Sequence, residues 1–229
     1  MIPLRDRNPS GSFPVVTVCI IILNVLVFFY ELSLGRHLDN LIVHFGVVPL
    51  KVTHFSTING ATVLNTYFPF LSYLFLHGGF IHLIGNIWYL WIFGDNVEDT
   101  LGHLKFILFY FVCGIVSAIV HVVFNSQSGV PCVGASGAIA GILGAYMVTF
   151  PRARILVVLP LFIVWEFIEL PAAMVLGFWF VIQFFIGVAT LSSSGGEGVA
   201  WWAHIGGFVS GIILIKLLSR SRYCHNSDF

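Results

Sequence analysis

Charged side chains are scarce in this sequence. Asp, Glu, Lys and Arg make up 9% of its 229 residues, whereas about 25% is usual in a soluble domain. That shortage excludes a soluble globular protein. Ten acidic residues balance ten basic ones, so the chain lacks the positive charge that a nucleic acid partner requires, and we expect no such partner.

Cysteines and metal-binding motifs are also sparse. The sequence has no H-E-x-x-H motif, and its histidines have no carboxylate or thiolate at ligand spacing, which argues against a zinc hydrolase. Paired aspartates are absent from the apolar runs, which removes an aspartyl-type intramembrane mechanism. We therefore expect neither a metal nor a cofactor. The four cysteines lie far apart, without a C-x-x-C pair, and are expected to be free thiols: Cys19, Cys113, Cys132 and Cys224.

Hydrophobic residues are abundant instead. They make up 58% of the chain, which also has 23 glycines, a composition typical of a membrane protein with several spans. A membrane helix needs about 20 apolar residues. The segment 155–164 reaches about half that length and is interpreted as interfacial or re-entrant, with a seventh span as the alternative. Six runs predict an all-α bundle with spans at 15–32, 70–93, 104–124, 136–150, 172–191 and 200–218.

The basic residues are unevenly distributed around these spans. Only Arg36 and Lys51 lie on one side. Because basic residues concentrate on the cytoplasmic side of membrane proteins, both termini are expected there. We predict a short cytoplasmic tail at 1–14, a membrane domain at 15–219 and a second cytoplasmic tail at 220–229. The other eight basic residues share the side of the termini: Arg5, Arg7, Lys105, Arg152, Arg154, Lys216, Arg220 and Arg222.

Two of the predicted connections are unusual. The loop at 33–69 is long and apolar without forming a full span, and long loops in compact domains are usually functional or mobile. The fourth span is short, so Ser136 at its start lies below the outer border of a hydrocarbon core about 30 Å thick. The polar loop at 125–134 must then dip inward, where irregular backbone is tolerated only beside protein or water. This predicts a wet cavity that opens to the extracytoplasmic side.

Ser136 is a candidate nucleophile. Gly134 and Gly137 leave its hydroxyl unobstructed, and the start of the helix offers unpaired N–H groups to a developing anion. A serine also needs a base within hydrogen-bond reach, and His204 lies about one turn into the sixth span, at the same depth. The alternatives are a serine that caps a packing helix and a histidine that bonds a neighbouring backbone.

Small residues predict how these two helices dock. Gly137 and Gly141 lie four apart on the fourth span, as do Gly207 and Gly211 on the sixth. Two such faces allow backbones to touch, so docking the helices would bring Ser136 to His204.

His82 and Asn86 are candidate oxyanion donors. They lie four apart on one face of the second span, and one such donor is worth about 3 to 4 kcal/mol in a serine protease. The alternative is a polar pair that holds helices together. Asp95, Glu98 and Asp99 lie at the far end of that span, so no triad carboxylate is evident and the chemistry predicted is that of a Ser-His dyad.

The motifs resemble those of the rhomboid family of intramembrane serine proteases. The resemblance rests on His77-Gly-Gly-Phe-Ile-His82-Leu-Ile-Gly-Asn86, on Gly134-Ala-Ser136-Gly137 and on Ala203-His204 followed by Gly207 and Gly211. It implies a six-span rhomboid-like core of prokaryotic type in a plasma membrane, with transmembrane protein substrates entering from the lipid. It also implies Ser136 as nucleophile, His204 as base, and His82, Asn86 and the Ser136 N–H as oxyanion donors.

The sequence departs from that resemblance at two places. Many rhomboids have a Trp-Arg pair in the first loop, which is absent before His77 here. Some have a tyrosine four residues after the nucleophile, where this chain has Ala140. The alternatives to a protease are a catalytically silent rhomboid-like protein that binds client transmembrane helices, and a small transporter. The first typically lacks the Ser or the His, and the second predicts repeat symmetry and a charged midplane site. The oligomeric state cannot be predicted.

Overall fold

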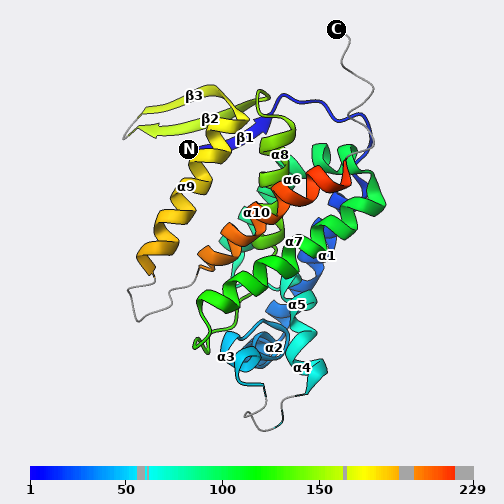
Figure 1. Cartoon of the computed structure of the whole chain (residues 1–229), viewed down its shortest axis with the longest axis vertical. Coiled ribbons are helices and arrows are strands. Elements are labelled where there is room, and N and C mark those ends of the chain that lie inside the picture. Colours follow the sequence, from blue (N-terminus) through cyan, green and yellow to red (C-terminus); the bar gives the residue numbers. More distant parts are fainter. Residues whose placement is uncertain (56–59, 61, 162–163, 191–198, 220–229) are drawn as a thin grey trace.

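Helices dominate the computed structural model, which describes residues 1–55, 60, 62–161, 164–190 and 199–219. The predicted all-α membrane bundle is confirmed, because a helix occupies each of the six expected spans. Cys224, Arg220, Arg222 and the predicted tail at 220–229 lie outside the described residues. The six helices of the bundle are α1 (Val15–Ser33), α6 (Phe80–Leu101), α7 (His103–Phe124), α8 (Ser136–Thr149), α9 (Ala172–Thr190) and α10 (Trp201–Leu218) (Figure 1).

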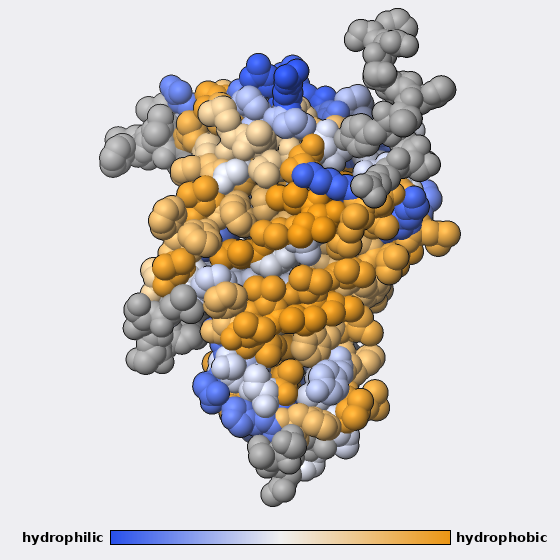
Figure 2. Space-filling view, viewed as in Figure 1, coloured by the Kyte–Doolittle hydropathy of each residue, from blue (hydrophilic) through white to orange (hydrophobic). Residues whose placement is uncertain are grey.

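The bundle has the length and surface of a membrane domain. Helices α1, α7, α9 and α10 are each long and apolar enough to cross a membrane, and α6 qualifies together with the segment before it, from which it is bent by 74°. Figure 2 shows an apolar surface across the middle of the molecule, with hydrophilic residues at its two ends. The chain is therefore a multi-pass membrane protein.

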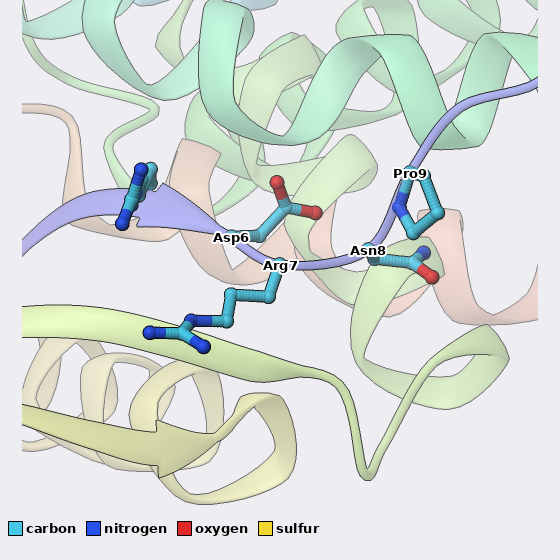
Figure 3. Close-up of a pocket in the computed structure, with 5 residues that line it drawn as sticks. Asp6, Arg7, Asn8 and Pro9 are labelled. Atoms are coloured by element: carbon cyan, nitrogen blue, oxygen red, sulfur yellow. The ribbon is translucent and has the colours of Figure 1, made fainter.

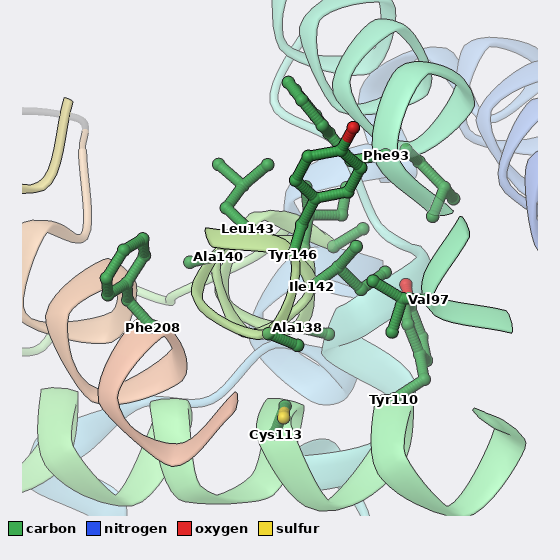
Figure 4. Close-up of a cluster of buried hydrophobic side chains, with 14 of the residues drawn as sticks. Phe93, Val97, Tyr110, Cys113, Ala138, Ala140, Ile142, Leu143, Tyr146 and Phe208 are labelled. Atoms are coloured by element: carbon green, nitrogen blue, oxygen red, sulfur yellow. The ribbon is translucent and has the colours of Figure 1, made fainter. Parts of the chain in front are cut away.

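Helix α8 forms the centre of the bundle. It has only 14 residues, as expected for the short fourth span, and ten of them in succession, Gly137 to Tyr146, are buried. It packs against α6, α7, α9 and α10. Figure 4 shows its side chains Ala138, Ile142 and Tyr146 surrounded by Phe93 and other apolar groups of the neighbouring helices. The start of this helix, where Ser136 lies, is therefore held by the helices around it.

The second span begins later than predicted. Residues expected at the start of a helix at 70–93 instead form the end of a chain of short helices. Helix α6 starts only after Gly79. The φ of this residue, 153°, favours glycine, and the chain changes direction here between the short helices and α6. The first loop consists of η1 (Gly35–His37), α2 (Leu38–Phe45), α3 (Pro49–Thr53), α4 (Val63–Tyr67), α5 (Pro69–Ser72) and η2 (Tyr73–Phe75).

This loop lies at one end of the bundle, beside the loop that precedes α8 (Figure 1). Val47 and Cys132 exchange backbone hydrogen bonds of 3.0 and 2.8 Å, and the Leu50 N–H donates to the Ser128 carbonyl at 2.9 Å. Burial raises the pKa of the Cys132 thiol to about 12, which favours an unreactive thiol. The first loop therefore supports the segment that leads to Ser136.

A small antiparallel sheet occupies the opposite end of the bundle. Its strands β1 (Ile2–Asp6), β2 (Arg154–Leu161) and β3 (Val164–Pro171) lie in the order β1-β2-β3. The alternative of a seventh span at 155–164 is wrong, because β2 covers most of this segment and pairs with β1 and β3 at the end of the bundle; its interfacial position stays a prediction. The run is a strand because its β-branched residues suit a pleated surface: Ile155 and Val157 are fully buried. The segment predicted as an N-terminal tail, 1–14, contains strand β1 of this sheet.

Polar contacts attach this sheet to the bundle. The Tyr146 hydroxyl at the end of α8 donates to the Asp6 carboxylate at 2.6 Å, and the Trp88 indole N–H of α6 donates to the Pro3 carbonyl at 2.6 Å. Burial raises the pKa of the Asp6 carboxyl. An open cavity of about 510 Å³, lined by residues 5–9, lies beside these contacts (Figure 3). It is at the opposite end of α8 from Ser136 and takes no part in the candidate site.

Glu98 fixes the start of the first span. Its carboxylate accepts from the N–H groups of Val16 and Thr17, each at 2.8 Å, and from the Thr17 hydroxyl at 2.7 Å. The first N–H groups of a helix have no partner within the helix, so a buried acceptor here stabilises α1. Glu98, at the end of α6 away from Ser136, therefore has a structural role.

Candidate active site

Ser136 and His204 meet at the centre of the bundle. Ser136 is the first residue of α8, and His204 lies one turn into α10. The Nε2 atom of His204 is 2.9 Å from the Ser136 hydroxyl oxygen, and both side chains are half-buried. A neutral imidazole at this distance can accept the serine proton, so the pair has the geometry of a nucleophile with its base.

Glycines allow this approach. Helices α8 and α10 touch through their backbones: a Cβ added to Gly207 would overlap the carbonyl oxygen of Gly137, and a Cβ added to Gly211 would overlap that of Gly141. The structure places the two predicted glycine faces against each other. Since larger residues would force the helices apart, these glycines set the distance between Ser136 and His204.

His82 lies beside the loop that enters α8. Gly134 has a φ of 120°, and a Cβ built on it would lie 2.6 Å from Cε1 of His82 and 3.6 Å from Nδ2 of Asn86. The Gly78 N–H donates to Nδ1 of His82 at 3.4 Å. Neutral His82 must then carry its proton on Nε2, and this nitrogen faces Gly134. His82 can therefore donate a hydrogen bond toward the start of α8.

Asn86 supplies a second donor. Its side chain is buried, and the amide nitrogen Nδ2 has no hydrogen-bond partner among the described residues. A buried donor without a partner costs about 1 to 3 kcal/mol, so such a group needs a reason to be retained. An anion that forms only during a reaction would satisfy it. The position of Asn86 next to Gly134 fits the oxyanion role.

Buried polar groups also hold the turn before α6. The His77 N–H donates to the carboxylate of Glu31 on α1 at 3.1 and 3.3 Å, and the His77 ring lies 5.2 Å from that of His82. Glu31 was not predicted, although a carboxylate within an apolar span is itself a signal. It fixes the turn that positions His82.

Gln183 is the second residue that the sequence did not reveal. Its carbonyl oxygen Oε1 lies 2.6 Å from Nδ1 of His204, on the opposite side of the ring from Ser136. Apart from Thr190 at the end, the rest of α9 is apolar, aromatic or glycine. A lone amide within a membrane span indicates a functional residue. This feature of the sequence could have identified Gln183.

Comparison with known proteins decides the family. The Rhomboid domain family matches residues 64–221, a range that includes all the residues of the site described above except Glu31. The chain belongs to the rhomboid family.

Rhomboid relatives resemble this chain over its core. RHOMBOID-like protein 4 of Arabidopsis thaliana is 30% identical over 154 residues, which is 67% of this chain and 34% of that protein. Presenilin-associated rhomboid-like protein A, mitochondrial, of Danio rerio is 33% identical over 93 residues, 40% of this chain and 24% of that protein. The chain thus spans well under half the length of these relatives.

This rhomboid holds its histidine with a distinct set of neighbours. Ala140 occupies the position where some relatives place a tyrosine, and it provides no ring to stack on His204. The rings of Trp179 and Trp201 approach His204 instead, with centroid distances of 5.9 and 6.2 Å. Together with Gln183, they restrain the imidazole on the sides that Ser136 leaves open.

Replacing Asn86 tests the oxyanion role in this rhomboid. We expect Asn86→Ala to lower kcat by about 10² to 10³ with little change in KM, because one oxyanion donor acts mainly in the transition state. The measurement is steady-state cleavage of a transmembrane reporter in detergent. Asn96→Ala is the matched control, since Asn96 is also a buried asparagine of α6 but lies at its other end. Equal kcat values for both variants would contradict the role.

Proposed function

We propose that this rhomboid is an intramembrane serine endopeptidase that cleaves transmembrane segments near the extracytoplasmic face with a Ser136-His204 dyad. The observation that carries the proposal is the 2.9 Å distance between Nε2 of His204 and the hydroxyl oxygen of Ser136, at a helix start next to two side-chain donors. Membership of the family and the multi-pass fold support the proposal, as does the presence of both Ser136 and His204 in the chain.

The proposed reaction proceeds in two stages. Ser136 attacks the peptide carbonyl while His204 accepts the hydroxyl proton, and the C–O bond that forms gives a tetrahedral oxyanion. Donors from His82, Asn86 and the Ser136 N–H stabilise this anion. His204 then protonates the leaving amine as the C–N bond breaks. In the second stage, water adds to the acyl-enzyme as His204 accepts its proton. The ester C–O bond to Ser136 then breaks and His204 returns the proton to the serine oxygen, which releases the acid and restores Ser136.

The substrate is proposed to be a membrane helix that unwinds locally. A peptide bond within a helix is shielded by its own hydrogen bonds, so cleavage requires a stretch of weak helicity. A cavity of about 60 Å³ lies between α6, α9 and β1, lined by Tyr89, Trp179 and other apolar side chains. It shows that α6 and α9 are incompletely packed against each other, which suits a substrate that arrives from the lipid.

The orientation and the membrane are parts of the same proposal. We place both termini in the cytoplasm, with a tail at 1–14, the membrane domain at 15–219 and a tail at 220–229. Arg5, Arg7 and Arg154 lie in or beside the sheet, whereas Arg36 and Lys51 lie in the first loop at the opposite end. A prokaryotic plasma membrane was implied by the resemblance, while the name of the Danio rerio relative places that protein in mitochondria. Reporter fusions at each end and membrane fractionation decide both points.

Reconstituted protein tests the activity. Wild-type protein in liposomes is expected to cut a single-span reporter near its extracytoplasmic end and to react with a fluorophosphonate probe, whereas folded His204→Ala protein should do neither. An intact reporter together with an unlabelled wild-type protein contradicts the proposal. If that protein nevertheless retains the reporter on purification, the outcome supports the catalytically silent, client-binding alternative.

A further inference from the structure

We propose that Gln183 is a positioning residue that fixes the tautomer and orientation of His204 within the Ser136-His204 dyad. This inference rests on the proposed function. It concerns a residue on α9, a helix that contributes no other polar group to the site. Gln183 does not touch the reacting atoms, and it acts through His204.

The donor or acceptor capacity of each atom determines the direction of the hydrogen bonds that link Gln183, His204 and Ser136. The Oε1 atom of Gln183 is a carbonyl oxygen and can only accept, so Nδ1 of His204 donates its proton across the 2.6 Å contact. A neutral imidazole has one N–H, which leaves the lone pair on Nε2. That atom faces the Ser136 hydroxyl at 2.9 Å. The tautomer that Gln183 selects is the one in which His204 can act as a base.

Burial makes this selection effective. The Gln183 side chain is only 7% exposed, and an amide buried in a membrane protein without a partner is costly. Its contact with His204 therefore fixes both groups. The Trp179 and Trp201 rings limit tilting of the imidazole, but neither ring can accept a proton from Nδ1 through a lone pair. Gln183 is the neighbour that distinguishes one ring nitrogen from the other.

Among the described residues, the His204 ring bonds to an uncharged amide and a hydroxyl, and no carboxylate is bonded to it. An acidic residue beside His204 would stabilise the imidazolium, but a charge at this depth would have to be buried without a counterion. Two other titratable side chains, His82 of α6 and His121 of α7, are close enough to interact electrostatically with His204. An amide orients the base without adding a charge.

Two substitutions separate positioning from packing. Gln183→Met keeps the length of the side chain but removes the acceptor, and we expect kcat to fall about 10- to 100-fold at unchanged KM, the loss of one oriented hydrogen bond to the base. Gln183→Glu restores an acceptor. It should recover most of kcat, and its carboxylate should move the acidic limb of the kcat/KM pH profile to higher pH because it stabilises the imidazolium. Phe185→Met, on the lipid-exposed side of α9, is the control and should match wild type.

A readout without catalysis distinguishes failure of this inference from failure of the proposed function. In protein labelled with ¹⁵N-histidine, the His204 signals, assigned by their loss in His204→Ala, should show a protonated Nδ1 and a bare Nε2 at neutral pH. Gln183→Met should shift this population toward the other tautomer. A wild-type His204 with its proton on Nε2, or a Gln183→Met protein with wild-type kcat, would overturn the role of Gln183. Cleavage that survives Ser136→Ala would instead refute Ser136 as the nucleophile, and with it the proposed function on which the inference rests.

Discussion

Ser136→Ala is expected to lower the cleavage rate of a transmembrane reporter by about 10⁴-fold or more, the scale seen when a serine protease loses its nucleophile. Alanine cannot form the acyl-enzyme, and the oxyanion donors alone provide little turnover. The unfolding temperature of the variant should remain close to that of wild type. The Ser136 side chain is half-buried, and among the described residues its hydroxyl bonds to His204 alone.

A second serine controls for this change. Ser117 of α7 is fully buried and lies against Gly137, one residue from the nucleophile. Ser117→Ala removes a hydroxyl from the same neighbourhood without touching His204, and we expect activity within a few-fold of wild type. The two variants are compared by fragment yield over time and by fluorophosphonate labelling. Cleavage by Ser136→Ala protein at the wild-type rate would refute the assignment of the nucleophile.

Gly207→Ala is expected to impair both stability and activity, and it acts through packing rather than chemistry. The added Cβ would overlap the carbonyl oxygen of Gly137, which belongs to a helix backbone and cannot rotate away. Overpacking of this kind costs about 1 to 3 kcal/mol or more. The added methyl group would push α8 and α10 apart, and these two helices hold Ser136 and His204. Labelling by the fluorophosphonate probe should therefore fall together with the unfolding temperature.

Gly85→Ala is the matched control for that substitution. Gly85 also lies within a bundle helix, α6, but apart from the helix's own nearby backbone an added Cβ would meet no atom of the described residues within 4 Å. Alanine is favoured over glycine in a helix by about 1 kcal/mol, so this variant should be as stable as wild type or more so. Unfolding is measured in detergent by heating. If Gly207→Ala and Gly85→Ala unfold at the same temperature, the backbone contact between α8 and α10 does not control stability.

The sequence was most informative where polar groups interrupt apolar spans. Ser136, His204, His82 and Asn86 stand out because membrane helices rarely carry such groups without a reason, and the glycine spacing indicated which helices meet. That these side chains lie close together follows from their equal depth in the membrane, which can be counted in residues along each span. The roles of these residues in catalysis stay a prediction.

Other features depend on partners that are distant in the sequence. Gln183 had no visible partner, because its relation to His204 depends on how α9 rotates against α10. The sheet was not predicted because β2 is apolar and about half as long as a span. Its partner β1 lies far away in the sequence, so the residues around β2 do not reveal the pairing. The late start of α6 reflects the Gly78-Gly79 turn, where the conformation of the backbone prevailed over a continuous apolar run.

The pairing of β1 with β2 sets an order of events during synthesis. Ile2 pairs with Val158, so the first strand has no partner until the chain has been made through the fourth bundle helix. Contacts between residues so far apart in the sequence form slowly, because a long loop must close first. β1 can therefore join the sheet only after α8 has been synthesised, and its pairing joins the beginning of the chain to the hairpin that leads into α9. Closure of this end of the bundle is thus a late step of folding, completed once the central helix has been made.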